Sequence, residues 1–308
     1  MNCLGDLRMK LIILGSGGST PIPRPGCSCR VCVEARRKGI PYARTGSSLF
    51  IPGPNILFDT PEEIAVQLNR EGISSVDFIF YTHWHPDHTL GMRIVERMYM
   101  FWLGKFVRGE RPSKKVKVYA LKEVMRDLRA IRNKHGPFFD YYEKLGLIET
   151  FELENEGTVE VKGISITPIR VKTSWNVSTV FVVEKGDRKV AYAPCDSKPF
   201  PNANMVRNLD LLIIGNVFPE GPLKDGITIP ESNVLRKELF SLEEVLEISR
   251  RLNVNEIVIT HIEEEWGKSY DEYKELERRY REFNIRFAYD GMRISLQTPS
   301  DVPVLEKG

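Results

Sequence analysis

The stretch YTHWHPDH, residues 81–88, places three of the protein's five histidines within six residues. It ends the apolar run from Val76 to Tyr81, which predicts a buried strand. A loop at a strand end allows side chains to converge, and imidazole and carboxylate groups are ligands that zinc and similar divalent metals prefer. So dense a histidine cluster gives no packing benefit and repels itself when protonated. We therefore interpret the stretch as a metal centre rather than a polar surface loop.

A second cluster lies near the start of the chain. Cys27, Cys29 and Cys32 fall within six residues, and the chain has five cysteines in all. An odd number grouped in this way is a poor disulfide framework and a better metal site. Three thiols in a short loop are typical of a structural zinc site, which needs a fourth ligand; the alternative is three unrelated free thiols. Reduced thiols lead us to expect a cytoplasmic protein.

Composition narrows the class of protein. The 308 residues are 42% hydrophobic and 28% charged, with a net charge of +2, as in an ordinary globular protein. This near balance gives no overall attraction to nucleic acid or membranes. We recognise no signal peptide and no apolar stretch of about 18 residues, so no membrane span is expected.

Short apolar runs alternate with amphipathic stretches along the whole chain, which predicts an α/β protein. We expect a helix from Pro61 to Arg70 with Thr60 as its N-cap, and another capped by Ser241 with Glu244 completing a capping box. The aromatic-rich residues 136–147 are expected to be irregular. The simplest organisation is one domain over residues 1–308, with residues 98–149 as an insertion within it.

The pattern His-x-His-x-Asp-His at a strand end resembles the signature of the metallo-β-lactamase superfamily. The resemblance implies an αββα sandwich, in which outer helices flank two mixed sheets. It implies that His83 and His85 bind a first metal, and that Asp87 and His88 bind a second. Two further ligands, each after a predicted strand, match the family's bridging aspartate and last histidine: Asp196 and His261. A turn aspartate and a strand-end histidine are the alternatives.

One family ligand is missing. The resemblance places a histidine after the predicted strand Ile164–Val171, where this chain has Thr173. Thr173 or water is a candidate substitute, and His135, in the expected insertion, is the only unassigned histidine. Loss of one ligand from the first site should weaken metal binding there, whereas the second site stays complete.

The cysteine loop resembles that of one subgroup, the phosphodiesterases associated with carbon–phosphorus lyase pathways. The resemblance extends over most of the chain and includes Gly15–Ser19 and Ile56–Asp59. Pyrroloquinoline quinone biosynthesis B proteins share the loop and the layout. In the phosphodiesterases a histidine three residues after the last catalytic one completes the zinc site, and here that position is Glu264. The rivals for this fourth ligand are Glu263, Cys3 and Cys195.

These resemblances imply a metal-dependent hydrolase that acts on a small phosphodiester through a metal-activated water. Asp87 is the candidate to orient that water or accept its proton. The expected cofactors are one or two catalytic zinc ions, or manganese or iron in their place, and one structural zinc. We expect a small anionic substrate, no membrane partner and, by analogy, a homodimer.

Three other functions stay open. An RNA-processing nuclease of the same superfamily shares the histidine signature, so nucleic acid is a less favoured partner. A non-hydrolytic, metal-binding biosynthetic protein would resemble the quinone-biosynthesis group. A binding protein with a relic site is the third. Activity on structured RNA but not on small diesters would favour the first, and the absence of any hydrolysis with metal bound would favour the second.

Overall fold

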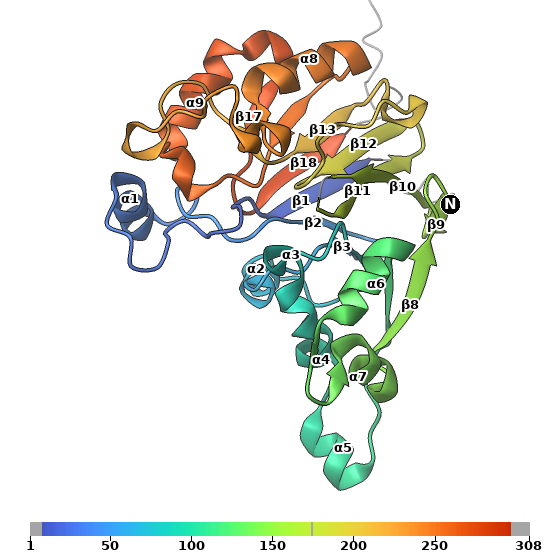
Figure 1. Ribbon diagram of the computed structural model, residues 1–308. Helices are drawn as coiled ribbons and strands as arrows, with labels where there is room; N and C mark the ends of the chain where they lie inside the picture. The colour runs from blue at the N-terminus through green and yellow to red at the C-terminus, as the bar shows by residue number, and fades with distance from the viewer. Residues whose placement is uncertain (1–7, 174, 297–308) are drawn as a thin grey trace, which may run out of the picture.

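The computed structural model describes residues 8–173 and 175–296. Within this part of the chain, two seven-stranded mixed sheets face each other (Figure 1). The first sheet has the order β18-β1-β2-β3-β4-β5-β8, with bounds Met292–Leu296, Met9–Gly15, Ser48–Ile51, Ile56–Phe58, Phe78–Phe80, Val116–Leu121 and Ile148–Leu153. The second has the order β17-β16-β13-β12-β11-β10-β9, with bounds Ile285–Phe287, Ile257–Ile259, Leu211–Ile214, Arg188–Ala193, Val177–Lys185, Ile164–Lys172 and Val159–Val161.

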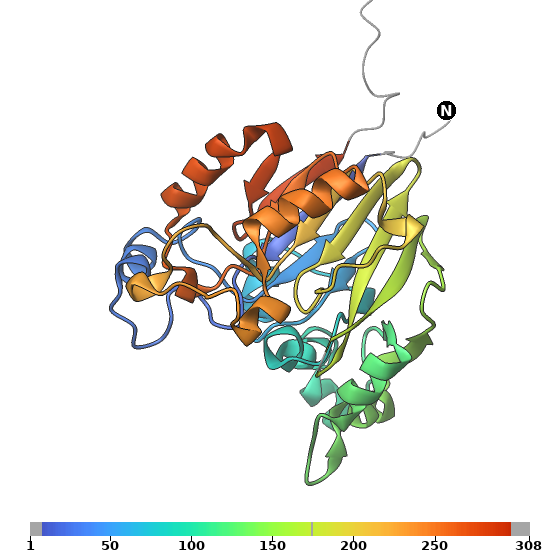
Figure 2. The same cartoon turned by 45° about the horizontal axis from the view of Figure 1, so that its top comes forward.

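Helices cover the outer faces of both sheets. On the first sheet α2 (Ile64–Arg70) packs against β1, and α6 (Lys122–Ala130) and α7 (Phe138–Leu145) pack against β8. On the second, α8 (Leu242–Leu252) and α9 (Tyr270–Arg279) lie together on the opposite side of the molecule (Figures 1 and 2). This layering confirms the expected αββα sandwich.

The remaining elements are short. The helices are α1 (Arg30–Lys38), α3 (Pro86–Thr89), α4 (Ile94–Tyr99) and α5 (Trp102–Arg108), and two strand pairs are β6 (Arg132–Asn133) with β7 (Gly136–Pro137) and β14 (Val217–Phe218) with β15 (Phe240–Ser241). Figure 1 shows α5 at the far end of the molecule from α8 and α9. No helix in the described residues is long and apolar enough to cross a membrane.

The main core fills the space between the sheets. Phe58 of the first sheet packs on Phe181 and Tyr192 of the second, with ring centroids 5.4 Å apart in both pairs. All three are buried, and aromatic pairs at this distance add to the stabilisation from area burial. Strand β13 is buried on both faces, because Leu211 and Ile213 join this core whereas Leu212 and Ile214 pack beneath the outer helices. That explains its continuous apolar run.

Local expectations are met unevenly. The capping box of Ser241 and Glu244 is confirmed at the start of α8. The helix expected from Pro61 begins only at Ile64, because the Thr60 hydroxyl bonds to the Tyr81 hydroxyl, 2.8 Å away, instead of capping it. Residues 136–147 are not irregular: most of them form α7. Residues 98–149 include β5 and the start of β8, and these strands pair in parallel at the edge of the first sheet; that residues 98–149 are an insertion stays a prediction.

Candidate metal centre

The histidine cluster lies where the carboxyl ends of strands from both sheets meet. After β4 the chain turns at His83 and enters the one-turn helix α3, with Pro86 at its first position. His83 and His88 are completely buried, and the His85 side chain is one-third exposed. The ring of His83 lies 4.4 Å, centroid to centroid, from the rings of both His85 and His88. The short helix thus converts neighbours in sequence into converging side chains.

Asp59, the residue after β3, fixes two of these rings. Its buried carboxylate accepts hydrogen bonds from the Thr82 backbone nitrogen (2.8 Å) and hydroxyl (2.9 Å), and lies 2.9 Å from His88 Nδ1. The Thr82 hydroxyl lies 2.9 Å from His83 Nδ1. Because that hydroxyl donates to Asp59, it accepts from His83 Nδ1. Both Nδ1 atoms are therefore engaged and Nε2 is left as the free ligand atom on both rings.

The free ring nitrogens provide the test of whether a metal fits. Nε2 of His83 and Nε2 of His88 are buried and have no hydrogen-bond partner. A buried polar atom without a partner is costly, and such atoms in a native protein call for an explanation. Each of the two rings belongs to a group of three converging donors, so a divalent cation bound by each group would satisfy these nitrogens. The residues present therefore fit a metal such as zinc.

Asp87 and His261 complete one side of the cluster. Asp87 Oδ2 lies 3.2 Å from His261 Nε2 and 3.4 Å from His88 Nε2. Burial would raise the pKa of Asp87, but the two imidazoles outweigh it and hold that pKa well below its usual range. Gly215, at the end of β13, permits this packing, because a Cβ there would collide with the Pro194 carbonyl oxygen and press on the His261 side chain.

On the other side, Asp196 and its neighbour Cys195 both follow β12. Asp196 Oδ2 lies 3.7 Å from His85 Nε2 and accepts a hydrogen bond from Asn176 Nδ2 at 3.2 Å. The buried Cys195 sulfur belongs to two groups of ligand atoms, each within 4.8 Å of one another: with His83 and His85, and with His88 and His261. Burial opposes ionisation of the thiol, yet the imidazoles of His261 and His83 hold the pKa of Cys195 well below its usual range.

Thr173, which stands where the family has its remaining histidine, forms hydrogen bonds to residues that closely follow it. The Thr173 hydroxyl accepts hydrogen bonds from the backbone nitrogens of Trp175 and Asn176, and donates to the Asn176 carbonyl. It is therefore engaged locally, and it is Asn176 that reaches the centre by its bond to Asp196. His135 is exposed between β6 and β7 and belongs to none of the donor groups found in the described residues.

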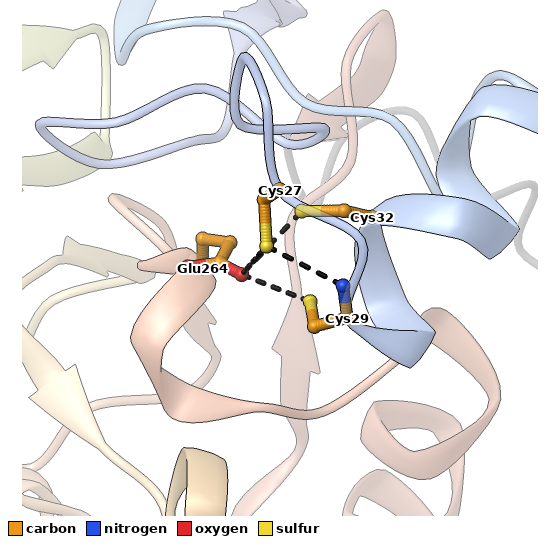
Figure 3. Close-up of side chains that lie close together, drawn as sticks. All are labelled: Cys27, Cys29, Cys32 and Glu264. Carbon is orange, nitrogen blue, oxygen red and sulfur yellow. Dashed lines mark hydrogen bonds between the residues drawn. The ribbon is translucent and has the colours of Figure 1, made fainter.

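The three clustered cysteines converge on Glu264, as Figure 3 shows. Glu264 Oε1 lies 3.3, 3.0 and 3.4 Å from the sulfur atoms of Cys27, Cys29 and Cys32. Lys224 Nζ also contacts this oxygen, at 2.6 Å. Burial would raise the pKa of Glu264, but hydrogen bonds from Cys29 and Lys224 lower it to about 2. Three sulfurs and one carboxylate oxygen form a set of four donors suited to zinc.

The rivals for the fourth position lie elsewhere. Glu263 accepts hydrogen bonds from Ser19 and lies 3.3 Å from His261 Nδ1. Cys195 lies with the histidines, and Cys3 is outside the described residues. A cleft of about 510 Å³ lies beside both clusters. Its wall includes Asn216, which donates to the Cys195 sulfur at 3.2 Å, and Lys224, which contacts Glu264.

Two important residues of the histidine centre were not assigned to it from the sequence. Asp59 carried a usable signal, since it directly follows the apolar run of β3. Cys195 adjoins Asp196 after the same strand, and the sequence alone does not tell which of the two side chains lies among both pairs of histidines.

Comparison with known proteins identifies the protein family. The protein-family model described as "Beta-lactamase superfamily domain" matches residues 54–262 of the sequence. A solved diphosphatase of the PhnP family is 24% identical, with a TM-score of 0.69 and coverage of 94% of this chain and 97% of that one. Zinc-bound PqqB from Methylobacterium extorquens is 17% identical, with a TM-score of 0.67 and coverage of 94% and 100%. The short form of human tRNase Z is 16% identical, with a TM-score of 0.62 and coverage of 94% and 100%.

Curated relatives match over shorter segments. An octanoyltransferase of Porphyromonas gingivalis is 30% identical over 168 residues, which are 53% of this chain and 30% of that protein. A ribonuclease Z of Clostridium tetani is 27% identical over 84 residues, which are 27% of this chain and 22% of that protein. This chain thus spans less than a third of the length of either. The solved structures support the fold, and the family model supports the superfamily expected from the histidine signature.

Proposed function

Because this chain belongs to the β-lactamase superfamily, we propose that it is a metal-dependent hydrolase acting on a small phosphodiester. One observation carries the proposal: four histidines form two groups of converging donors that share Cys195, and two buried Nε2 atoms among them lack hydrogen-bond partners. Such a set of nitrogen and sulfur donors favours zinc, with manganese or iron as weaker candidates. A cation bound there supplies a water of lowered pKa and offsets the charge on a phosphoryl oxygen.

The protein's own groups prepare this chemistry. Asp59 and Thr82 hold the rings of His88 and His83 so that Nε2 faces the centre. Asp87, whose pKa is held below its usual range by His88 and His261, is ionised at neutral pH and would orient the attacking water by accepting a hydrogen bond from it. We keep Asp196, beside His85, as a further ligand.

The cleft beside the centre supports a small anionic substrate. Lys224 and Arg24 on its wall would attract a phosphate, and apolar side chains such as Leu223 and Trp266 would hold an organic substituent. Asp225, Glu263 and Glu265 on the same wall would disfavour substrates with further negative charge.

The cysteine cluster has a structural rather than a catalytic role in this proposal. We propose that Cys27, Cys29, Cys32 and Glu264 hold one zinc ion, which ties the N-terminal loop to the segment after His261. All four described cysteines are free, so a reducing cytoplasm stays our proposed compartment. A homodimer stays a proposal by analogy, tested by light scattering of the purified protein.

The test starts from protein stripped with a chelator. Zinc should restore hydrolysis of a chromogenic phosphodiester such as bis(p-nitrophenyl) phosphate, and His88→Ala should abolish it. His135→Ala is the matched control, because His135 is exposed and outside the centre. Full turnover in His88→Ala would contradict the proposal. Zinc-loaded protein with no turnover on any diester, ester or lactam would instead favour the non-hydrolytic alternative.

A second candidate function is that of an RNA-processing nuclease, and the surface of helix α5, residues Trp102–Arg108, favours it. We call this helix the arm. Phe106 and Val107 on this helix are about three-quarters exposed, and Lys105 and Arg108 beside them add positive charge. Exposed aromatic and basic side chains suit single-stranded or looped RNA. Cleavage of a structured RNA that depends on this arm, without turnover of small diesters, would select this function.

A further inference from the structure

The metal centre contains a donor that the histidine signature does not include. We propose that the Cys195 sulfur, rather than the Asp196 carboxylate, is the ligand shared between the two halves of the centre. The inference rests on the proposed metal-binding function and specifies its chemistry.

The position of the sulfur carries the inference. It lies within 4.8 Å of the ligand nitrogens of His83 and His85 on one side, and of those of His88 and His261 on the other. Cys195 is the one residue common to both groups in the part of the chain that the structure describes. Only 4% of the residue is exposed, so the thiol is enclosed by the donors around it.

Asp196 lies near the first half of the centre alone. Its Oδ2 atom is 3.7 Å from His85 Nε2, and the same oxygen accepts a hydrogen bond from Asn176. Asp196 belongs to neither group of converging donors. Asp196 is thus placed to support the first half and cannot serve both halves equally.

A sulfur ligand also answers the loss of a histidine. The first half holds only His83 and His85 from the signature, because Thr173 is engaged within its own turn. The Cys195 sulfur supplies a third donor there, which is the number a catalytic zinc site needs. Thiolate selects zinc over manganese or magnesium, which prefer oxygen ligands. Asn216 donates to the sulfur at 3.2 Å and stabilises its negative charge.

Cadmium-113 NMR tests the inference independently of turnover, since thiolate ligands shift the cadmium resonance strongly to high frequency. In the cadmium-loaded wild type, a resonance separate from that of the cysteine cluster should have a thiolate-type shift. Cys195→Ser should move it towards the range of nitrogen and oxygen ligands and leave the other resonance in place. Asp196→Asn, the matched control, should keep the thiolate-type shift.

Cys195→Asp guards against a variant that fails to fold, because it retains an anionic donor at this position. It should keep cadmium at the centre and lose the thiolate-type shift. A centre resonance unmoved by both Cys195 substitutions, but moved by Asp196→Asn, would overturn the inference. Absence of any centre resonance in the wild type would overturn the proposed metal function as well, so the two failures are distinguishable.

Discussion

Asp59→Asn should weaken metal binding although Asp59 is not one of the proposed ligands. The amide oxygen can still accept from the Thr82 backbone nitrogen, as Oδ1 does now. The amide NH2 would then face His88 Nδ1, which now lies 2.9 Å from Oδ2. Since two donors cannot bond, His88 would move its proton to Nε2 and lose the lone pair directed at the centre.

Loss of such a supporting bond typically costs roughly 10–100-fold in metal affinity, which corresponds to about 1.4–2.8 kcal/mol. The assay is a competition titration of zinc against a chromophoric chelator. Asp290→Asn is the matched control, because Asp290 is an equally buried carboxylate that accepts from Ser16 and Thr45 and contacts no histidine. Both variants should lose stability, but only Asp59→Asn should lose affinity. Equal zinc affinities in Asp59→Asn and the wild type would refute the reasoning.

Three other predictions test separate parts of the structure. Glu264→Gln should reduce the zinc content by up to one ion per chain and lower the thermal midpoint, measured by elemental analysis and calorimetry; unchanged zinc and midpoint would exclude Glu264 as a ligand. Phe181→Ala should destabilise the protein by about 3–5 kcal/mol in urea unfolding, because it removes the ring that packs on Phe58 between the two sheets. Phe106 is exposed, so Phe106→Ala should change the stability by less than about 0.5 kcal/mol. Similar losses in the two variants would argue against a core between the sheets. Burial opposes ionisation of Asp77, but Lys114 and Lys162 lower its pKa to about 2. The stabilisation of the fold by the Asp77 carboxylate is therefore fully present above the unfolded pKa of about 3.9 and fades as pH falls towards 2. A difference in unfolding free energy between the wild type and Asp77→Asn that stays constant from pH 5 to 2 would contradict this.

Much of the site could be predicted because its residues follow apolar strands. The histidines of residues 83–88 and His261 stand directly after buried runs, and parallel strands bring their carboxyl ends together. Glu264 was reached through the resemblance to the phosphodiesterases, which implies a ligand three residues after His261, and the structure places it against the three cysteines. In these cases the local sequence pattern and the tertiary arrangement agree.

The rest depended on contacts that local sequence does not record. The aromatic residues 136–147 form α7 because Phe139 and Tyr142, three residues apart, pack together into the core. Thr60 looks like a helix cap, but its hydroxyl is bonded to that of Tyr81, the residue directly after β4. Cys195 and Asp196 are adjacent after β12, and only the tertiary structure shows that the Cys195 sulfur lies among the histidines of both groups.

Anomalous diffraction at the zinc edge, from crystals of zinc-loaded protein, tests the central claim most directly. The account predicts one peak bonded to three sulfurs and Glu264, and at least one peak between the histidines, within bonding distance of His83 or His88 Nε2 and of the Cys195 sulfur. Crystals with density only at the cysteine cluster, and with the histidine nitrogens bonded to water or to one another, would contradict it.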